Sequence, residues 1–424
     1  MAVCGRNFRP QNYIAEKKNM EDRINNIESA DDNLKLKELH KDRALGCMVG
    51  GAVGDALGYA VEFKQWLEIE RKFGPRGITR YCLAASGKAL ISDDTQMSLF
   101  TGAGILLGMT RSYMRGIMGR LDTYCRYTYL DWLHTQEWKS RRSECRVDSW
   151  LMDVPELYSL RSPGITCLTA LKDLEAGKEV VNDSCGCGGV MRTAPIAILS
   201  YLHSYADGKI DYCDMVAAEA ARITHKHPLG FLPSAVLNDI LMQIMGGEAD
   251  DGDRLGYVVE KAAERLPLIH SGEDGKTYGE LWPKEVSRLQ EILSVASDLA
   301  SSDLPDHIAI ERIGGGWTGH EALAIAVYSA LKHKDSFEDA IVSAVNHSGD
   351  SDSTGAVCGN IIGILLGRKA IPEYYTKDLE LLDVIEEMGT DLYTGCIISE
   401  RMRFDTAEKF RWYNKYCKHK WEPL

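Results

Sequence analysis

The chain has 424 residues and a formal net charge of −13, with 45% hydrophobic and 26% charged residues. This composition is typical of a folded globular protein and excludes a disordered chain, a collagen-like repeat and a small disulfide scaffold. The net negative charge argues against nucleic acid as a partner and suits a protein that holds cations.

The first residues contain no apolar core of signal-peptide length, so nothing in them indicates secretion. The stretch that most resembles a membrane span, residues 44–61, is half Gly and Ala and includes Asp55. It therefore favours a buried helix and no membrane contact. Twelve cysteines are scattered without a CxxC pair, which predicts a reduced, cytoplasmic protein.

Three regions follow one another along the chain. Residues 1–43 form a charged amphipathic extension, in which Met20, Ile24 and Ile27 have helical spacing; we expect it to dock on the body or on a partner. Residues 44–395 form the body. Residues 396–424 are basic and aromatic, and predict a C-terminal helix with its aromatic side chains docked on the body rather than on nucleic acid.

The body reads as one helical pattern after another, separated by loops rich in Gly, Pro and Asp. Strand-like alternation is scarce, and residues 78–83 are one short candidate. We therefore predict a single all-α domain, an orthogonal multi-helix bundle. The predicted helical segments are 96–107, 215–223, 234–245, 257–266, 282–299, 322–331, 337–345 and 356–366.

Glycines recur at every fourth position of the first body helix. Gly46, Gly50, Gly54 and Gly58 form a stripe without side chains along one helical face. Each glycine costs roughly 1 kcal/mol in a helix interior. Four on one face predict that another backbone approaches closely, and that this helix lies at the centre of the domain.

Two acidic clusters precede apolar helices. The first is Ser92-Asp93-Asp94-Thr95, which taken alone is typical of ordinary helix capping. The second, Asp350-Ser351-Asp352-Ser353-Thr354-Gly355, imitates the start of an EF-hand loop. An EF-hand is excluded, because the twelfth position is Ile361 where the loop requires a bidentate Glu.

Carboxylates brought together at neighbouring helix starts would repel one another unless cations lay between them. Two divalent metals with oxygen ligands are the simplest solution, and the hydroxyls of Ser92 and Ser353 could complete their coordination. Oxygen ligands favour Mg²⁺, Mn²⁺ or Ca²⁺ over zinc. Glu62 follows Asp55 by seven positions, on the same helical face.

A third cluster is rich in glycine, with Ser184, Gly186, Gly188 and Gly189 before an apolar helix. Free backbone N–H groups in such a loop can bind phosphate or ribose oxygens, although a structural turn explains the pattern equally well. His225 and the neighbouring His227 could add a polar contact or be structural.

Taken together, these motifs resemble the ADP-ribosylglycohydrolase family. The segments that carry the resemblance span about three quarters of the chain in the family's order: GGAVGDALGYAVEF, SDDTQM, GCGGVMRTAPIAI, THKHP, GGGWTGHEALAIAVYSAL and NHSGDSDSTGAVCGNIIGILLG. The resemblance implies an all-α fold with a central site for two divalent cations, Mg²⁺ or Mn²⁺. It also implies cleavage of the N- or O-glycosidic bond that joins ADP-ribose to a protein side chain or small molecule.

Carried onto this sequence, the resemblance implies a role for each cluster. Residues of the glycine loop and one histidine would bind the substrate: Ser184, Gly186, Gly188, Gly189 and His225. The metal ligands would be Ser92, Asp93, Asp94, Asp350, Asp352 and Ser353, with Ser in place of the family's Thr at two positions. Glu62, or a metal-bound aspartate such as Asp93 or Asp352, would relay the proton.

The sequence departs from the family at one place. Members specific for arginine linkages carry an Asp shortly before a G-x-T-T stretch, where this chain has Ser162 and Pro163. The linkage that is cleaved therefore stays open. An alternative function is an immunity protein that occludes an ADP-ribosylating toxin with residues 1–43, with or without hydrolase activity.

Overall fold

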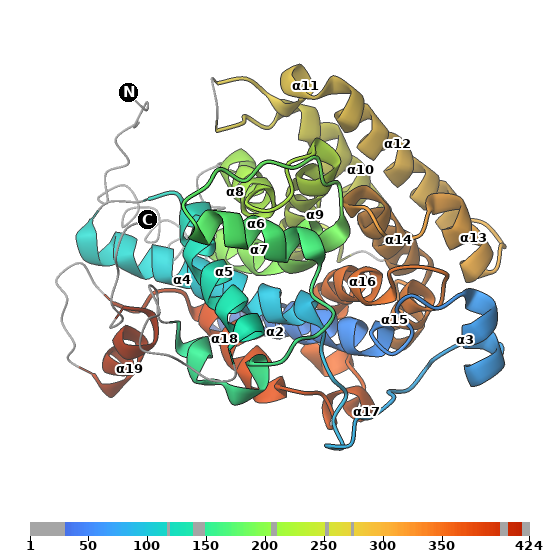
Figure 1. Ribbon diagram of the computed structural model, residues 1–424, viewed down its shortest axis with the longest axis horizontal. Coiled ribbons are helices and arrows are strands. Elements are labelled where there is room, and N and C mark those ends of the chain that lie inside the picture. Colours follow the sequence, from blue (N-terminus) through green and yellow to red (C-terminus); the bar gives the residue numbers. More distant parts are fainter. Residues whose placement is uncertain are drawn as a thin grey trace.

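The computed structural model describes residues 30–116, 119–138, 149–204, 210–250, 254–272, 275–398 and 406–417. Within these ranges the chain forms α-helices and short 3₁₀ turns, and its only β pairing consists of isolated bridges (Figure 1). The all-α prediction is confirmed. Each predicted helical segment coincides with a helix, although most of the helices begin three to six residues earlier than predicted.

The helices in chain order are α2 (Ala30–Gly58), α3 (Trp66–Phe73), α4 (Asp93–Arg115), α5 (Leu121–Glu137), α6 (Ile165–Glu175), α7 (Ala194–Ser204), α8 (Ile210–Arg222), α9 (Pro228–Met245), α10 (Arg254–Arg265), α11 (Tyr278–Leu281), α12 (Pro283–Ala300), α13 (Asp306–Ile313), α14 (Gly319–Lys332), α15 (Phe337–Val345), α16 (Ser351–Leu366), α17 (Glu373–Thr376), α18 (Leu382–Thr394) and α19 (Ala407–Tyr416). A 3₁₀ helix, η3 (Cys187–Arg192), lies in the glycine loop.

Helices α2 and α16 run antiparallel through the core, in contact along their glycine faces. A Cβ atom on any glycine of these pairs would overlap a backbone atom of the other helix, so the contact requires glycine on both sides. The prediction of a close backbone approach is confirmed. The pairs are Gly46 with Gly363, Gly50 with Gly359 and Gly54 with Gly355.

The other core helices pack around this pair. Helices α14, α15 and α18 contact α2 or α16, and α9 contacts both. Helix α9 is long and apolar enough to cross a membrane, but 89% of it is buried inside the protein. Its apolar surface is therefore explained by the core of this bundle. Helices α12 and α13 lie along one edge of the molecule (Figure 1).

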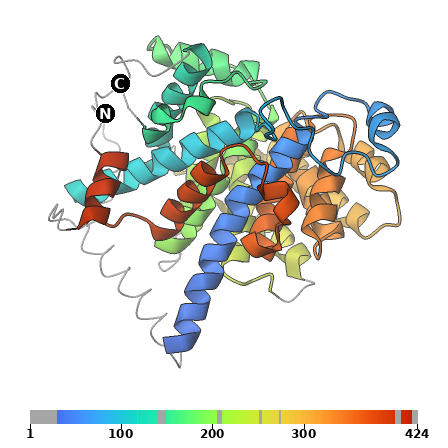
Figure 2. The same cartoon turned by 90° about the horizontal axis from the view of Figure 1, so that it is seen from below.

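Helix α2 runs without a break through the expected boundary between residues 43 and 44. Its first turns project from the body (Figure 2), and its next turn docks: Arg43 forms an ion pair with Asp250, and the His40 ring meets Tyr201 edge to face at 5.3 Å. The amphipathic spacing predicted from Met20 to Ile27 lies outside the described residues, so its docking stays a prediction.

Helix α19 docks on the body through its aromatic side chains, as the sequence favoured. Trp412 is buried and donates from Nε1 to Oγ1 of Thr110 on α4 at 3.0 Å. Tyr416 is also buried, and its hydroxyl donates to Asp391 on α18 at 2.6 Å. Trp421 lies outside the described residues.

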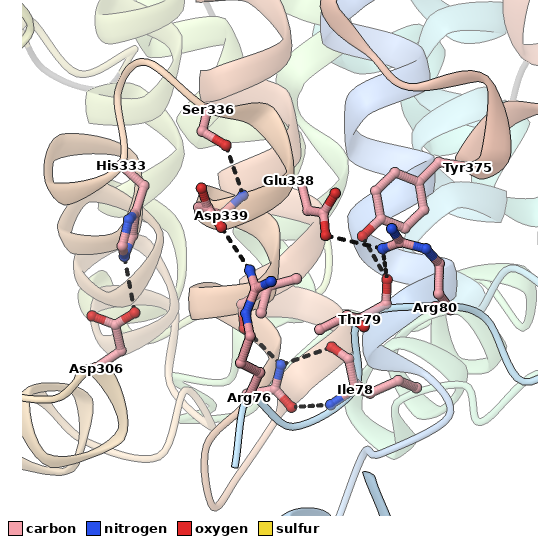
Figure 3. Close-up of polar contacts among 12 residues, drawn as sticks. Arg76, Ile78, Thr79, Arg80, Asp306, His333, Ser336, Glu338, Asp339 and Tyr375 are labelled. Atoms are coloured by element: carbon pink, nitrogen blue, oxygen red, sulfur yellow. Dashed lines mark hydrogen bonds and ion pairs between the residues drawn. The ribbon is translucent and has the colours of Figure 1, made fainter. Parts of the chain in front are cut away.

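Figure 3 shows how the segment between α3 and α4 is tied to α15 and the turn that follows it. Arg76 pairs with Asp339 at 2.8 Å on the exposed surface. The buried Ile78 donates its N–H to Oδ1 of Asn346 at 2.7 Å and accepts from Nδ2 of the same side chain at 2.9 Å. The predicted strand at 78–83 is wrong. The Asn346 side chain makes the pair of hydrogen bonds that a neighbouring strand would otherwise make with Ile78.

We expect Gly54→Ala to lower the free energy of unfolding by about 3 kcal/mol or more, because the new methyl group must push α2 and α16 apart. Gly256→Ala in α10 is the matched control: the new Cβ would make only an ordinary contact with Cδ2 of Leu331 at 3.9 Å, and the same change should raise stability by roughly 0.5–1 kcal/mol. Urea unfolding of both variants measures the difference. A neutral Gly54→Ala would contradict the tight contact.

Candidate active site

The two predicted acidic clusters form the N-termini of α4 and α16, next to the end of α2. Ser92 caps α4 by accepting from the N–H of Asp94 at 3.2 Å, and Asp350 caps α16 by accepting from the N–H of Ser353 at 3.4 Å. The side chains of Asp93, Asp94, Asp350 and Asp352 are at most 5% exposed. Capping alone does not explain so many buried carboxylates, because acidic capping residues normally remain in contact with water.

Asp55 on α2 holds the first turn of α4. Its carboxylate accepts from the N–H of Ser92 at 3.0 Å and from the N–H of Thr95 at 3.1 Å, and it also accepts from the Thr95 hydroxyl. Asp55 is completely buried. Burial raises the pKa of Asp55 to about 6, and the hydrogen bonds from Thr95 and Ser92 oppose that rise.

The buried carboxylates act on one another electrostatically. Burial, and then the charges of neighbouring carboxylates, raise the pKa values of Asp94 and Asp352 well above the usual range. Burial and the charges of Asp350 and Asp55 raise the pKa of Glu62 to about 8. These mutual effects show that the carboxylates of α2, α4 and α16 lie close together, and the raised pKa values favour their protonated forms unless cations compensate the charge.

The donor set of this region fits hard divalent cations. None of its carboxylates is paired with Lys or Arg among the described residues, and Oδ2 of Asp94 is buried without a hydrogen-bond partner there. As the side chains stand, no three His, Cys, Asp or Glu of the described chain enclose an ion. Carboxylate and hydroxyl oxygens are nevertheless the ligands that Mg²⁺ and Mn²⁺ prefer.

The glycine loop lies between the start of α9 and the segment before α14. The N–H of Cys187 donates to the carbonyl oxygen of Trp317 at 3.2 Å, and the N–H of Gly319 donates to that of Cys185 at 2.8 Å. The N–H of Gly186 meets Oγ of Ser184 at 3.4 Å. Some of the N–H groups that the sequence suggested for ligand binding are therefore used within the fold.

His225 packs against this loop. Its side chain is 2% exposed, and a Cβ atom on Gly188 would lie 3.3 Å from its Nε2. A Cβ atom on Gly189 would overlap the carbonyl oxygen of Gly230 in α9. The predicted substrate-binding residues are thus brought together. His227 has a structural position instead, because its Nδ1 caps α9 by accepting from the N–H of Leu229 at 3.1 Å.

Cys187 connects the glycine loop to the acidic region. Its thiol donates to Oδ2 of Asp350 at 2.7 Å. Local sequence patterns do not predict this contact, since the two residues lie 163 positions apart. The role of Asn182 was not predicted either: its Oδ1 accepts from the N–H groups of Ser184 and Lys226, both at 3.1 Å, and so ties the loop to the histidine segment.

The loop that departs from the family pattern lies at the same region. The N–H of Gly164 donates to Oδ2 of Asp93 at 3.2 Å, and the N–H of Asp93 donates to the carbonyl oxygen of Arg161 at 3.1 Å. Ser162 lies beside Glu62, where its hydrogen bond lowers the pKa of that carboxyl and so opposes the larger effect of burial. The sequence difference therefore falls where it can affect the chemistry.

A model of the ADP-ribosylglycohydrolase family matches residues 36–400. The chain belongs to this family. It is 24% identical to ADP-ribosylhydrolase ARH1 of Dictyostelium discoideum over 84% of this chain and 94% of that protein. It is 27% identical to the ADP-ribosyl-dinitrogen reductase glycohydrolase of Rhodospirillum rubrum over 80% of this chain and 91% of that protein.

A solved structure supports the fold. The chain is similar to an ADP-ribosylglycohydrolase-related protein complex with a TM-score of 0.54, at 20% identity, over 84% of this chain and 99% of that chain. The match to the family model confirms the family resemblance seen in the motifs. Family membership makes the protein a hydrolase of the ADP-ribosylglycohydrolase type.

We expect Asp55→Ala to lower the free energy of unfolding by about 3 kcal/mol or more, because it leaves the buried donors of Ser92 and Thr95 without an acceptor. Asp55→Asn keeps one oxygen acceptor and should lower the free energy of unfolding by less. Glu311→Ala, at an exposed position on α13, is the control. Chemical unfolding ranks the three. A stabilised Asp55→Asn would mean that repulsion from the neighbouring carboxylates outweighs the hydrogen bonds.

Proposed function

We propose that the protein is a metal-dependent hydrolase that removes ADP-ribose from an ADP-ribosylated protein side chain by cleaving an N- or O-glycosidic bond. The observation that carries this proposal is the contact between Cys187 and Asp350, which joins a glycine loop to a region of buried carboxylates. A substrate with its diphosphate on the loop would extend its ribose toward those carboxylates.

Six oxygen-bearing side chains would hold two divalent cations, Mg²⁺ or Mn²⁺. When bound, the ions supply positive charge that orients the ribose hydroxyls, polarises the scissile bond and lowers the pKa of a water molecule. The residues are Ser92, Asp93, Asp94, Asp350, Asp352 and Ser353. Their burial keeps bulk water away and strengthens every electrostatic interaction at the reacting carbon.

Substrate would be held from the other side by Ser184, Gly186, Gly188, Gly189 and His225. The small loop residues let the backbone approach a diphosphate closely. Glu62 is half-buried and lies beside the carboxylates, where it can take a proton from the attacking water. Asp93 or Asp352 would serve as the base if Glu62 does not.

The proposal does not specify which amino acid carries the ADP-ribose, because Ser162 and Pro163 replace the family's Asp in a loop that contacts Asp93. The decisive assay incubates the protein with peptides that carry ADP-ribose on Arg, on Ser and on Asp or Glu, with Mg²⁺, with Mn²⁺ and with EDTA. Release of ADP-ribose from one linkage, abolished by EDTA, supports the proposal. No release from any of them contradicts it.

Toxin occlusion by residues 1–43 stays a hypothesis that no contact in the described chain favours.

We expect Asp350→Asn to abolish the rise in melting temperature on adding Mg²⁺ or Mn²⁺, because an anionic ligand is lost while Asn can still cap α16. Glu311→Gln, on the exposed side of α13, should keep the full rise. Thermal scans with each metal and with EDTA measure the effect. Unchanged metal binding by calorimetry in Asp350→Asn would remove this residue from the ligand set.

We expect Glu62→Gln to keep ADP-ribose affinity while lowering the hydrolysis rate by roughly 10²–10⁴, the usual effect of losing a general base. Affinity by calorimetry and single-turnover rates should be measured on one folded preparation. A variant with lower stability but the wild-type rate would show that Glu62 is structural, and would leave Asp93 or Asp352 as the base.

A further inference from the structure

Arg192, at the end of η3, is fully buried and lies beneath the glycine loop. Its guanidinium stacks over the ring of Tyr129 at 4.4 Å and donates to the carbonyl oxygen of Ala220 at 3.2 Å. No carboxylate of the described chain forms an ion pair with it; two of its other contacts are with the sulfur atoms of Met97 and Cys167. Burying a cation without a carboxylate partner costs desolvation free energy, so another interaction must account for this guanidinium.

The shortest contact of Arg192 points to that interaction. Its Nη2 lies 2.7 Å from Oγ1 of Thr224, and the same oxygen lies 2.9 Å from Nδ1 of His225. A guanidinium can only donate, so Thr224 must accept from Arg192. Its single hydroxyl hydrogen is then left for another acceptor.

Three acceptors compete for that hydrogen. Nδ1 of His225 lies at 2.9 Å and the carbonyl oxygen of Ala221 at 3.4 Å, while the Cys167 thiol is a weak acceptor that also contacts Thr224. The carbonyl of Ala221 already accepts from the N–H groups of Thr224 at 3.2 Å and of His225 at 3.1 Å. The positive charge of Arg192 also favours a lone pair over an N–H on the near side of the ring. Nδ1 is therefore the acceptor.

An imidazole that accepts at Nδ1 carries its proton on Nε2 when neutral. Burial and the charge of Arg192 lower the pKa of His225 to about 3, so the ring is neutral at physiological pH. Nε2 has no hydrogen-bond partner among the described residues, and it faces Gly186 and Gly188, whose Cβ atoms would both lie 3.3 Å from it.

We propose that Arg192 and Thr224 are positioning residues that fix His225 as the Nε2–H tautomer, so that its ring donates a hydrogen bond to the diphosphate of an ADP-ribosyl group on the glycine loop. This inference rests on the proposed function for its ligand. A ring protonated on Nδ1 would turn a lone pair toward the anionic diphosphate and repel it. This relay, the hydrogen bonds from Arg192 to Thr224 and from Thr224 to His225, leaves the neutral ring with an N–H donor at Nε2.

The test removes the hydroxyl group of Thr224 and keeps the shape of its side chain. In protein labelled with ¹⁵N-histidine, two-bond ¹⁵N–¹H correlation spectra distinguish the two tautomers, and His225→Gln assigns the resonance. We expect the Nε2–H tautomer in the wild type and in Thr224→Ser, and its loss in Thr224→Val. Calorimetry with ADP-ribose should show binding weakened roughly 10-fold or more in Thr224→Val and restored in Thr224→Ser.

Thr128→Val is the matched control, because this buried threonine donates to the carbonyl oxygen of Phe100 and has no contact with His225. It should lose stability and keep both the tautomer and the affinity. An Nδ1–H or doubly protonated His225 in the wild type overturns the relay, even if Thr224→Val fails to fold. Wild-type tautomer and affinity in Thr224→Val overturn it as well. No binding of ADP-ribose to the wild type would overturn the ligand and the proposed function, while the spectrum still decides the relay.

Discussion

The contact between the glycine faces of α2 and α16 is the constraint on which the rest of the structure depends. Because no side chain separates the two backbones, the position of α16 along α2 is fixed within a narrow range. That register places Asp350 and Asp352, at the start of α16, beside the end of α2. Asp55 on the same helix then orients the first turn of α4 through its hydrogen bonds to Ser92 and Thr95. One packing contact therefore positions carboxylates from three segments far apart in the sequence.

The two halves of the candidate site differ in their charged side chains. The carboxylate region gathers buried acidic side chains without a compensating Lys or Arg among the described residues, which suits the divalent cations that we propose bind there. The glycine loop lies near the buried guanidinium of Arg192, and the hydrogen-bond contacts from Arg192 to Thr224 and from Thr224 to His225 connect the two. The proposed substrate matches this division, because its anionic diphosphate would lie on the glycine loop and its ribose hydroxyls would face the cations proposed for the carboxylate region.

Much of the architecture could be predicted from local patterns. Apolar periodicity found the core helices, and the four-residue spacing of Gly46, Gly50, Gly54 and Gly58 found the central contact. Most helix starts were placed too late, since polar capping turns such as Asp93–Gln96 lack the apolar signal. The strand at 78–83 was wrong, because the side chain of Asn346 satisfies Ile78 from 268 positions away. The roles of Asp55, Cys187 and Arg192 were not predicted for the same reason, because their partners are distant in the sequence and spacing does not reveal them.

The pairing of α2 with α16 also has a consequence for how the protein is made. Asn360 on α16 donates to the carbonyl oxygen of Cys47 on α2, a contact that spans 313 positions. During synthesis α2 emerges early and must wait for nearly the whole chain before its glycine face is covered. A nascent chain therefore exposes this bare backbone surface throughout translation, and the acidic helix starts are brought together only in the last stage. A chain that stalls before α16 lacks both the partner of the glycine face of α2 and the acidic residues Asp350 and Asp352, so its candidate site cannot assemble.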